Sequence, residues 1–413
     1  MDLGKRIIIG GGLAGMAGAF WCRRQNPGTT VVLYEKEDAL LSWSKRYRER
    51  GLSLGRERAS RELEEGAIVR GLPELAGMPG QWSGQATREW LASLGIELFG
   101  REDGSFAARD GVDFRQQFRE VLEKEGVEIR TGFSLESLSP QPEGGFRIWS
   151  REGIQDAGWK VLLATGGERN HGLAIAREEL GMGMRTPVPA YVRLRLASPR
   201  LGDRLGPLSR TIRLRCPRDG AEALGEATLS SRGLEGEAVS LLSGRFCEEW
   251  KSRGYRIPLE VDWLPEKSLS ELRGELSARS QSGRRNPIGG EALFGFTLRQ
   301  WQAFLGLSGI DSEAPWVRVK TRQLQTLAQR LKAHALVFSG MGLPKGERAW
   351  AGGIERAAID WSTCEATGTR GLHLAGEILD MLGEAGGAHL NLVWASAYLA
   401  GSAMAQGEPG GLR

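Results

Sequence analysis

The first forty residues constrain the fold of this chain more than any other stretch. Residues 6–9 are a strand-like apolar segment, and the glycine-rich turn of residues 10–15, GGGLAG, follows at once. Residues 16–24 have the composition of a helix, and residues 30–34 form a second strand-like segment that ends at Glu35. A G-x-G-x-x-G turn between strand and helix, with an acid after the next strand, is typical of a dinucleotide-binding βαβ unit.

The residues of this turn have separate expected roles. Gly10 permits the tight turn, Gly12 lets the backbone approach a pyrophosphate, and Gly15 lets the helix pack close to the sheet. The helix N-terminus offers free N–H groups and a positive dipole end to the phosphates. Glu35 lies 20 residues after Gly15, where a carboxylate can accept hydrogen bonds from a ribose. The cofactor-binding residues predicted from this unit are Gly10, Gly12, Leu13, Ala14, Gly15, Glu35 and Lys36.

Two alternatives exist for the same stretch. It could be a glycine-rich turn that binds nothing, or a secretory signal, since residues 7–21 are apolar and follow Lys5 and Arg6. Three consecutive glycines and the acid after the second strand argue against a signal.

Composition excludes several classes of protein. The 413 residues, 40% hydrophobic and 26% charged, allow two or three domains of a soluble globular protein. No apolar run approaches the roughly 20 residues that span a bilayer, so we expect no membrane partner. The cysteines are scattered without a C-x-x-C, which argues against a dithiol redox pair, a zinc cluster and a disulfide framework and favours the cytoplasm. They are Cys22, Cys216, Cys247 and Cys364.

Positive charge is concentrated in two stretches, although the net charge is only +4. Residues 42–61 carry a local charge of +5 and residues 193–218 a local charge of +7. These stretches could be ordinary solvated surface, a surface for a polyanion such as RNA, or arginines that face the cofactor phosphates. The residues proposed for RNA or anion contact are Lys45, Arg46, Arg48, Arg193, Arg195, Arg213 and Arg215.

The middle of the chain changes character twice. Residues 113–125 predict an amphipathic helix, and the strand-like residues 159–163 run into the turn Ala164, Thr165, Gly166, Gly167, where small residues let the backbone approach a ligand. After residue 187, short alternating segments predict an antiparallel sheet or small barrel. These segments are residues 191–196, 211–215, 226–230, 238–243 and 257–262. Leucines at helical spacing then predict helices between residues 268 and 334.

A second glycine-rich segment lies near the C-terminus. Residues 372–375 predict a strand, residues 376–387 contain GEILD and GEAGG, and residues 390–405 predict an apolar helix. A nucleotide-binding pattern at both ends means that one α/β domain is assembled from both termini. The predicted division is a cofactor domain of residues 1–187 and 353–413, an inserted β domain of residues 188–265 and 335–352, and an inserted helical domain of residues 266–334.

These motifs together resemble the FAD-dependent BaiN-like flavoprotein family, also known as YhiN or RdsA. The similar segments are residues 10–15 with Glu35, 163–167, 187–196, 225–236, 261–264, 351–360 and 376–401. The resemblance implies an α/β, Rossmann-like FAD domain with one β-barrel-like and one small helical insertion. It also implies flavin redox chemistry, and some members are assigned to the reduction of a uridine in ribosomal RNA. The further cofactor residues implied are Ala164, Thr165, Gly166, Gly376, Glu377, Asp380, Gly386, Gly387, Ala388, His389, Leu390 and Asn391.

The chain departs from the family pattern at three places. The family's S-G-G-G-R-C-N turn is replaced by residues 42–47, SWSKRY, and the long loop after A-T-G-G is cut to residues 168–172. The family's Tyr-Asn-Leu-Gln after the last Gly-Gly is Ala-His-Leu-Asn at residues 388–391. The resemblance places all three changes beside the flavin ring and its substrate.

Proton transfer could use a histidine. His389 in the C-terminal turn and His171 after A-T-G-G could each donate a proton during hydride transfer, or could be packing residues. His334 and His373 are expected to be structural. No second G-x-G-x-x-G is present, so NAD(P)H, if it reduces the flavin, would have to bind transiently.

We therefore predict an FAD-dependent oxidoreductase that transfers hydride between the flavin and an unsaturated carbon substrate, in a cleft between the cofactor domain and an insertion. One alternative is an rRNA uridine reductase, which the family and the basic stretches favour. Another is an FAD-binding protein that has lost catalysis, which the three departures favour. No metal is expected, and the partner is a small-molecule substrate or ribosomal RNA.

Overall fold

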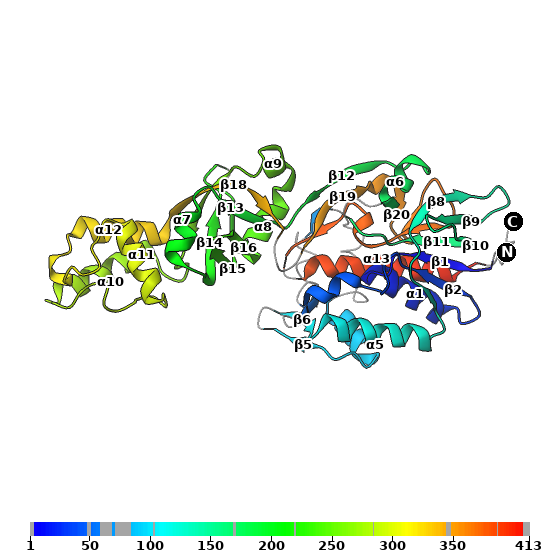
Figure 1. Ribbon diagram of the computed structural model, residues 1–413, viewed down its shortest axis with the longest axis horizontal. Helices are drawn as coiled ribbons and strands as arrows, with labels where there is room; N and C mark the ends of the chain where they lie inside the picture. The colour runs from blue at the N-terminus through cyan, green and yellow to red at the C-terminus, as the bar shows by residue number, and fades with distance from the viewer. Residues whose placement is uncertain are drawn as a thin grey trace. The chain divides into compact units, whose positions relative to one another are not determined.

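The computed structural model describes residues 4–47, 51–57, 68–70, 84–101, 104–167, 171–218, 220–283, 285–343, 348–385 and 387–407 (Figure 1). The chain divides into two compact units, Met1–Val188 with Ala349–Arg413, and Pro189–Arg348. None of the helices within these ranges is long and apolar enough to cross a membrane.

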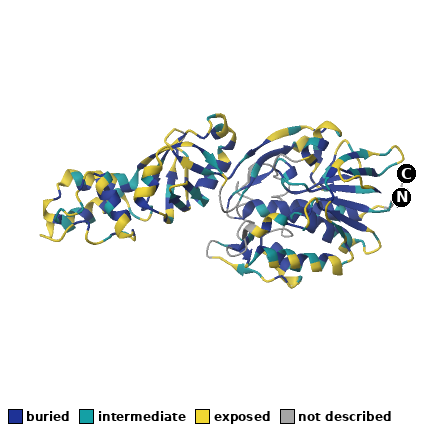
Figure 2. Cartoon of the chain, in the orientation of Figure 1, coloured by how far each residue is buried: buried dark blue, intermediate teal, exposed yellow. Residues whose placement is uncertain are grey.

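A seven-stranded sheet is the centre of the first unit. Its order is β20 (Ile359–Asp360), β21 (Glu365–Ala366), β22 (Leu372–Leu374), β11 (Lys160–Leu163), β1 (Arg6–Ile9), β2 (Val31–Tyr34) and β7 (Glu128–Arg130). From β22 to β7 neighbouring strands are parallel, and every residue of β1 and β2 is buried, as expected for a parallel sheet covered on both faces (Figure 2). Ile9 pairs with Leu163 on one side and with Tyr34 on the other, so the turns that follow β1 and β11 start at the same edge.

Helices from opposite ends of the chain pack together on this sheet. α1 (Leu13–Gln25) contacts α13 (Ala388–Ala405), and a Cβ added to Gly401 would lie 2.5 Å from the carbonyl oxygen of Gly18. The absence of side chains at this crossing allows the two backbones to approach closely. The C-terminal carbonyls of α13 are held from the sheet, since Arg6 donates to Met404 at 2.8 Å and Lys160 donates to Ala403 at 2.8 Å.

Smaller sheets and helices complete the first unit. They are β3 (Leu52–Arg56), β6 (Ser105–Ala108) and β5 (Phe99–Gly100); β10 (Gln155–Gly158), β9 (Phe146–Ser150) and β8 (Leu135–Pro140); β12 (Met184–Pro189) with β19 (Trp350–Ile354); β23 (Leu382–Gly383) with β4 (Ile68–Arg70); and the helices α4 (Gly84–Ser93), α5 (Gly111–Lys124) and α6 (His171–Glu178).

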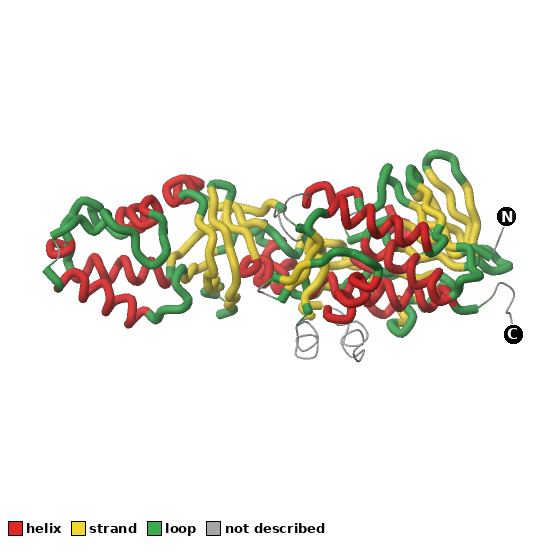
Figure 3. Tube along the Cα trace, turned by 90° about the horizontal axis from the view of Figure 1, so that it is seen from below, coloured by secondary structure: helices red, strands yellow, loops and turns green. Residues whose placement is uncertain are grey.

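The second unit contains a closed antiparallel barrel and helices (Figure 3). The barrel order is β13 (Arg193–Leu196), β16 (Gly233–Gly236), β15 (Glu222–Ser230), β14 (Leu208–Arg215), β17 (Pro258–Asp262) and β18 (His334–Gly342). The helices are α7 (Pro199–Leu205), α8 (Glu237–Arg245), α9 (Cys247–Ser252), α10 (Leu269–Gln281), α11 (Leu298–Leu307) and α12 (Thr321–Lys332). One hydrophobic core includes residues of both the strands and the helices.

The structure confirms the predicted fold class, an α/β Rossmann-like unit built from both ends of the chain with an inserted antiparallel barrel and a helical part. One predicted strand is wrong, because residues 238–243 lie in α8. Ala238, Val239 and Leu242 share the buried side of this helix, so their spacing fits the helical period as well as a strand.

Candidate functional site

The glycine turn after β1 packs directly on the turn after β11. Gly10 has φ +110, and a Cβ there would overlap the carbonyl oxygen of Ala164. A Cβ at Gly15 would overlap the carbonyl oxygen of Gly10. These two glycines are therefore required by the contacts of the turn with itself and with β11.

Gly12 is different, because a Cβ at this position would meet no protein atom within 4 Å. Gly12 is the N-cap of α1, where no side chain caps the helix and the first turn carries no acid among the described residues. The first N–H groups of a helix have no partner within the helix and attract anions. The open space and the uncapped helix end, next to Leu13 and Ala14, fit the predicted pyrophosphate.

The carboxylate of Glu35 closes the other side of the turn. It is nearly buried, its Oε2 accepts the N–H of Gly11 at 2.6 Å, and its Oε1 accepts the N–H of Glu37 at 2.9 Å. Each carboxylate oxygen has a second acceptor position, so Glu35 can still accept from a ribose hydroxyl. Lys36 is exposed, its Nζ lies 3.8 Å from Glu37, and its predicted contact with the cofactor stays a prediction.

A partly buried polar cluster supports β2 just before Glu35. The hydroxyl of Tyr34 donates to Asp156 at 2.5 Å, and Lys5 donates to the same carboxylate at 2.8 Å. Arg130 donates to the Tyr34 oxygen at 2.9 Å. Burial raises the pKa of Asp156, but the hydrogen bonds from Lys5 and Tyr34 outweigh it and lower that pKa overall. Sequence reasoning missed this cluster, because residue 156 is distant along the chain and belongs to no motif.

The turn Ala164, Thr165, Gly166, Gly167 meets the C-terminal motif. A Cβ at Gly167 would lie 2.6 Å from the backbone oxygen of Glu377 and 2.8 Å from its Cβ. The predicted residues of the two motifs are thus brought into contact from positions about 210 residues apart. Gly376 begins the short 3₁₀ turn that carries Glu377, and its N–H donates to Ser396 of α13 at 3.0 Å.

Glu377 and His389 form a hydrogen-bonded pair. The Nε2 of His389 lies 3.0 Å from Oε1 of Glu377, and the N–H of Trp350 donates to the same oxygen at 3.3 Å. The other ring nitrogen of His389, Nδ1, accepts the N–H of Gly383 at 3.3 Å. The His389 side chain is 1% exposed and has partners on both nitrogens. The proton-donor role given to His389 stays a prediction.

Asp380 binds the neighbouring ribbon. Its Oδ1 accepts the N–H of Gly352 on β19 at 3.0 Å, and Arg185 on β12 lies 3.6 Å from Oδ2. The carboxylate therefore connects the two strands of this ribbon, and its predicted contact with the cofactor stays a prediction.

The start of α13 packs on β3. Gly387 has φ +105, and a Cβ there would lie 2.7 Å from Gly55. The amide of Asn391 accepts the N–H of Arg56 at 3.4 Å and donates to its carbonyl oxygen at 3.1 Å. Ala388 is buried, and the N–H of Leu390 donates to the carbonyl oxygen of Gly387 at 3.1 Å. Gly386 lies outside the described residues. Asn391 thus holds β3, a contact that no local pattern indicated.

His171 begins α6 and is exposed. Its Nε2 donates to the carbonyl oxygen of Glu136 on β8 at 2.8 Å. The catalytic role given to His171 stays a prediction.

The basic residues predicted from charge have different surroundings. Arg213 and Arg215 on β14 both bind Glu222, at 3.2 Å and 2.5 Å, so their charge is partly compensated. Arg193 and Arg195 on β13 lie across from Gly342 and Gly340 on β18. Lys45 is exposed, whereas Arg48 and the side chain of Arg46 lie outside the described residues.

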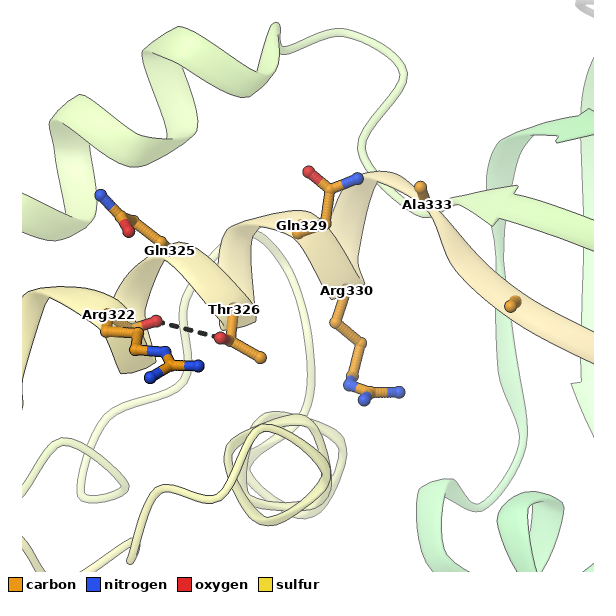
Figure 4. Close-up of a pocket in the computed structure, with 7 residues that line it drawn as sticks. Arg322, Gln325, Thr326, Gln329, Arg330 and Ala333 are labelled. Carbon is orange, nitrogen blue, oxygen red and sulfur yellow. Dashed lines mark hydrogen bonds between the residues drawn. The ribbon is translucent and has the colours of Figure 1, made fainter.

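A pocket of about 460 Å³ lies on α12 of the second unit (Figure 4). Its lining combines polar side chains with two alanines and contains no acid, and its residues are Arg322, Gln325, Thr326, Gln329, Arg330, Ala333 and Ala335. Arg322, Thr326 and Arg330 project from one side of α12 (Figure 4). No sequence-predicted site residue lines this pocket, so we place the candidate cofactor site at the glycine turns, where the motif residues meet.

The chain is similar to several known proteins along most of its length. Over 412 residues the chain is 27% identical to the 3-dehydro-bile acid delta(4,6)-reductase of Clostridium scindens, covering 97% of this chain and 98% of that protein. The solved 3-ketosteroid-delta4-(5alpha)-dehydrogenase of Rhodococcus jostii RHA1 is 14% identical, with a TM-score of 0.48 and coverage of 98% and 97%. A flavocytochrome c3 fumarate reductase in an open conformation is 13% identical, with a TM-score of 0.45 and coverage of 97% and 78%.

The family comparison covers almost the whole chain. Residues 4–403 match the model of the HI0933-like protein Rossmann domain, which includes both glycine-rich ends and everything between them. This match confirms the resemblance drawn from the motifs. The chain belongs to the HI0933-like family of Rossmann-domain proteins.

Proposed function

We propose that this protein is an FAD-dependent oxidoreductase that transfers hydride between the flavin and an unsaturated carbon substrate. The observation that carries the proposal is the uncapped N-terminus of α1, where Gly12 leaves open space beside the ends of β1 and β11. The family membership and the reductase activity named for the Clostridium scindens relative support the same reaction class.

The residues present fit the cofactor. The α1 N-terminus would hold the pyrophosphate, and Glu35 would accept from the adenosine ribose. Bound flavin would supply the hydride chemistry, while the protein provides binding, orientation and exclusion of water. We propose NAD(P)H as the reductant. Because the sequence has one G-x-G-x-x-G, this nucleotide would enter and leave during turnover.

Flavin content and reduction test the proposal. The purified protein should carry FAD or bind it on addition, with the visible absorbance of oxidised flavin, and NADH or NADPH should bleach that absorbance under anaerobic conditions. Failure to bind FAD would contradict the proposal. Bound FAD that neither nucleotide reduces, and that dithionite does reduce, would favour the alternative of a flavin-binding protein without catalysis.

A second candidate function is reduction of a uridine in RNA, which the pocket on α12 favours. Neither Arg322 nor Arg330 has an ion-pair partner within the described ranges, and Nε of Arg330 is buried without a hydrogen-bond partner there. Guanidinium, amide and hydroxyl groups are the side chains that contact phosphates and sugars in nucleic-acid complexes.

The salt dependence of RNA binding checks this candidate. Replacing Arg322 and Arg330 together with Gln should weaken binding of a short single-stranded RNA and reduce the slope of log K against log salt by about 1.4, for two lost phosphate contacts. The double variant Arg119→Gln with Arg253→Gln is the matched control, because these arginines are already paired with Glu123 at 2.8 Å and with Glu249 at 3.0 Å. An unchanged slope in the double variant, or no RNA binding at low salt, would contradict the RNA function.

A further inference from the structure

Four oxidisable aromatic side chains of the first unit touch one another in series. Trp394 on α13 meets Trp90 on α4, with ring centroids 5.7 Å apart and ring planes at 74°. Trp90 meets Trp21 on α1 at 5.4 Å, and Trp21 meets Tyr398 on α13 at 5.1 Å. Centroid separations of about 4.5 to 7 Å are those of aromatic rings in contact. We call these four residues the aromatic path.

The inner end of the aromatic path lies beside the candidate cofactor site. Trp394 is 1% exposed, and its indole N–H donates to the carbonyl oxygen of Leu54 on β3 at 2.7 Å. Gly55, the next residue of β3, packs against Gly387 at the start of α13. Trp394 is therefore fixed at the contact of β3 with α13, where the predicted cofactor residues 387–391 lie.

The outer end of the aromatic path reaches the surface. Trp21, Trp90 and Tyr398 are each partly exposed, whereas Trp394 is buried. Trp394 and Tyr398 are four residues apart on α13, so both project from the same side of this helix. An electron vacancy that starts on the buried ring can therefore reach partly exposed rings by steps between rings that touch.

The residue types distinguish this series from ordinary packing. Phe20 and Phe118 also touch the ring of Trp90, with centroids 5.5 Å and 5.9 Å away, and fill the same apolar region. Indole and phenol rings lose an electron far more readily than a phenyl ring does. Every member of the series from Trp394 to Tyr398 is a tryptophan or a tyrosine. Because electron transfer slows steeply with distance, contact between oxidisable rings favours transfer along this series.

We propose that the aromatic path is a one-electron route that carries an oxidising equivalent from the candidate cofactor site to the protein surface. The inference rests on the proposed function and deepens it, because one-electron oxidants arise where a flavin meets oxygen or light. Trp394 gives one electron to the oxidant and regains one from Trp90, which regains one through Trp21. Tyr398 supplies the last electron and releases its phenolic proton to water, which leaves a neutral phenoxyl radical. A soluble thiol restores the phenol by giving up a hydrogen atom and becomes a thiyl radical.

The outer step can be measured without any flavin. Azide radicals from pulse radiolysis oxidise accessible indole rings, and indolyl and phenoxyl radicals absorb at separate wavelengths. In the flavin-free wild type, indolyl absorbance should decay while phenoxyl absorbance rises at the same rate, whatever the protein concentration. Tyr398→Phe and Trp21→Phe should each lose most of that rise. A rise that both variants retain, or no rise in wild type, would overturn the route.

The inner steps are measured in the FAD-loaded protein, with light as the source of the oxidant. A short pulse absorbed by the flavin should produce the phenoxyl absorbance in wild type, and Trp90→Phe should abolish it. Trp90→Tyr, which keeps an oxidisable ring at this position, should restore a phenoxyl signal. A packing role alone would make these two variants equal, since each replaces the indole with a single six-membered ring. A phenoxyl yield in Trp90→Phe equal to that of wild type would overturn the inner steps.

Controls distinguish failure of the route from failure of the proposed function. Trp149→Phe removes a partly exposed indole on β9, in a different sheet, and should leave both radical signals as in wild type. A wild-type protein that binds no FAD would contradict the proposed function, and the start of the route with it. Radical transfer in the flavin-free protein separates that failure from failure of the aromatic path itself.

Discussion

Gly12→Ala is expected to leave the fold intact and to reduce FAD affinity at least a hundredfold. The added methyl group meets no protein atom within 4 Å, and the backbone of Gly12 at φ −80 suits alanine. Replacing a glycine in such a conformation changes stability by about 1 kcal/mol or less. The methyl group would instead occupy the space where the pyrophosphate of a dinucleotide approaches the turn.

Gly15→Ala is the contrasting variant in the same turn. Its Cβ would overlap the carbonyl oxygen of Gly10, so we expect a loss of about 3 kcal/mol or more in the free energy of unfolding. Denaturant unfolding of the flavin-free proteins and FAD titrations of the folded ones measure the two effects separately. If Gly12→Ala bound FAD like wild type, the pyrophosphate would not lie at this turn.

The turn that contains these two glycines could be predicted from the sequence because its constraints are local. A strand, a tight turn and a helix must follow each other within residues 6–25, and only a few residue types allow that path. The strand β11 could also be predicted, since its apolar residues run into the small-residue turn A-T-G-G, whereas its pairing with β1 was not predicted. The same logic found the C-terminal motif, although not the partners of its side chains.

The hydrogen-bond partners of these side chains could not be predicted from the sequence, because the paired residues come from distant segments of the chain. Asn391 binds Arg56 across 335 positions, and Tyr34 binds Asp156 across 122. Nothing in the sequence next to either residue specifies such a pairing. Glu377 and Asp380 are equivalent in the motif, and only their contacts distinguish a carboxylate that pairs with a histidine from one that holds a β-ribbon.

The two buried histidines should make the protein sensitive to acid. Burial lowers the pKa of His334 to about 4, helped by the positive charge of Arg330. Burial also lowers the pKa of His373 to about 4, and outweighs its bond to the carbonyl oxygen of Thr363. His334 accepts the indole N–H of Trp263 at 3.2 Å, and Nε2 of His373 is buried without a partner in the described part of the chain.

The sign of the effect follows from proton uptake. An unfolded histidine has a pKa of about 6.5, so between pH 6.5 and pH 4 the unfolded state binds more protons than the folded state. Stability is therefore complete above about pH 6.5 and falls as the pH approaches 4. The folded pKa values of about 4 imply a loss of about 3 kcal/mol for each histidine.

Hydrogen exchange resolved by peptide, followed from pH 7 to pH 4, measures this loss in each unit separately, because a two-unit chain need not unfold in one step. His334→Gln should flatten the pH dependence of the second unit and His373→Gln that of the first, even though each variant is less stable at pH 7. His171→Gln, a change at an exposed ring, is the control and should follow wild type. If wild-type protection did not fall between pH 6.5 and pH 4, these histidines would not be held neutral by burial.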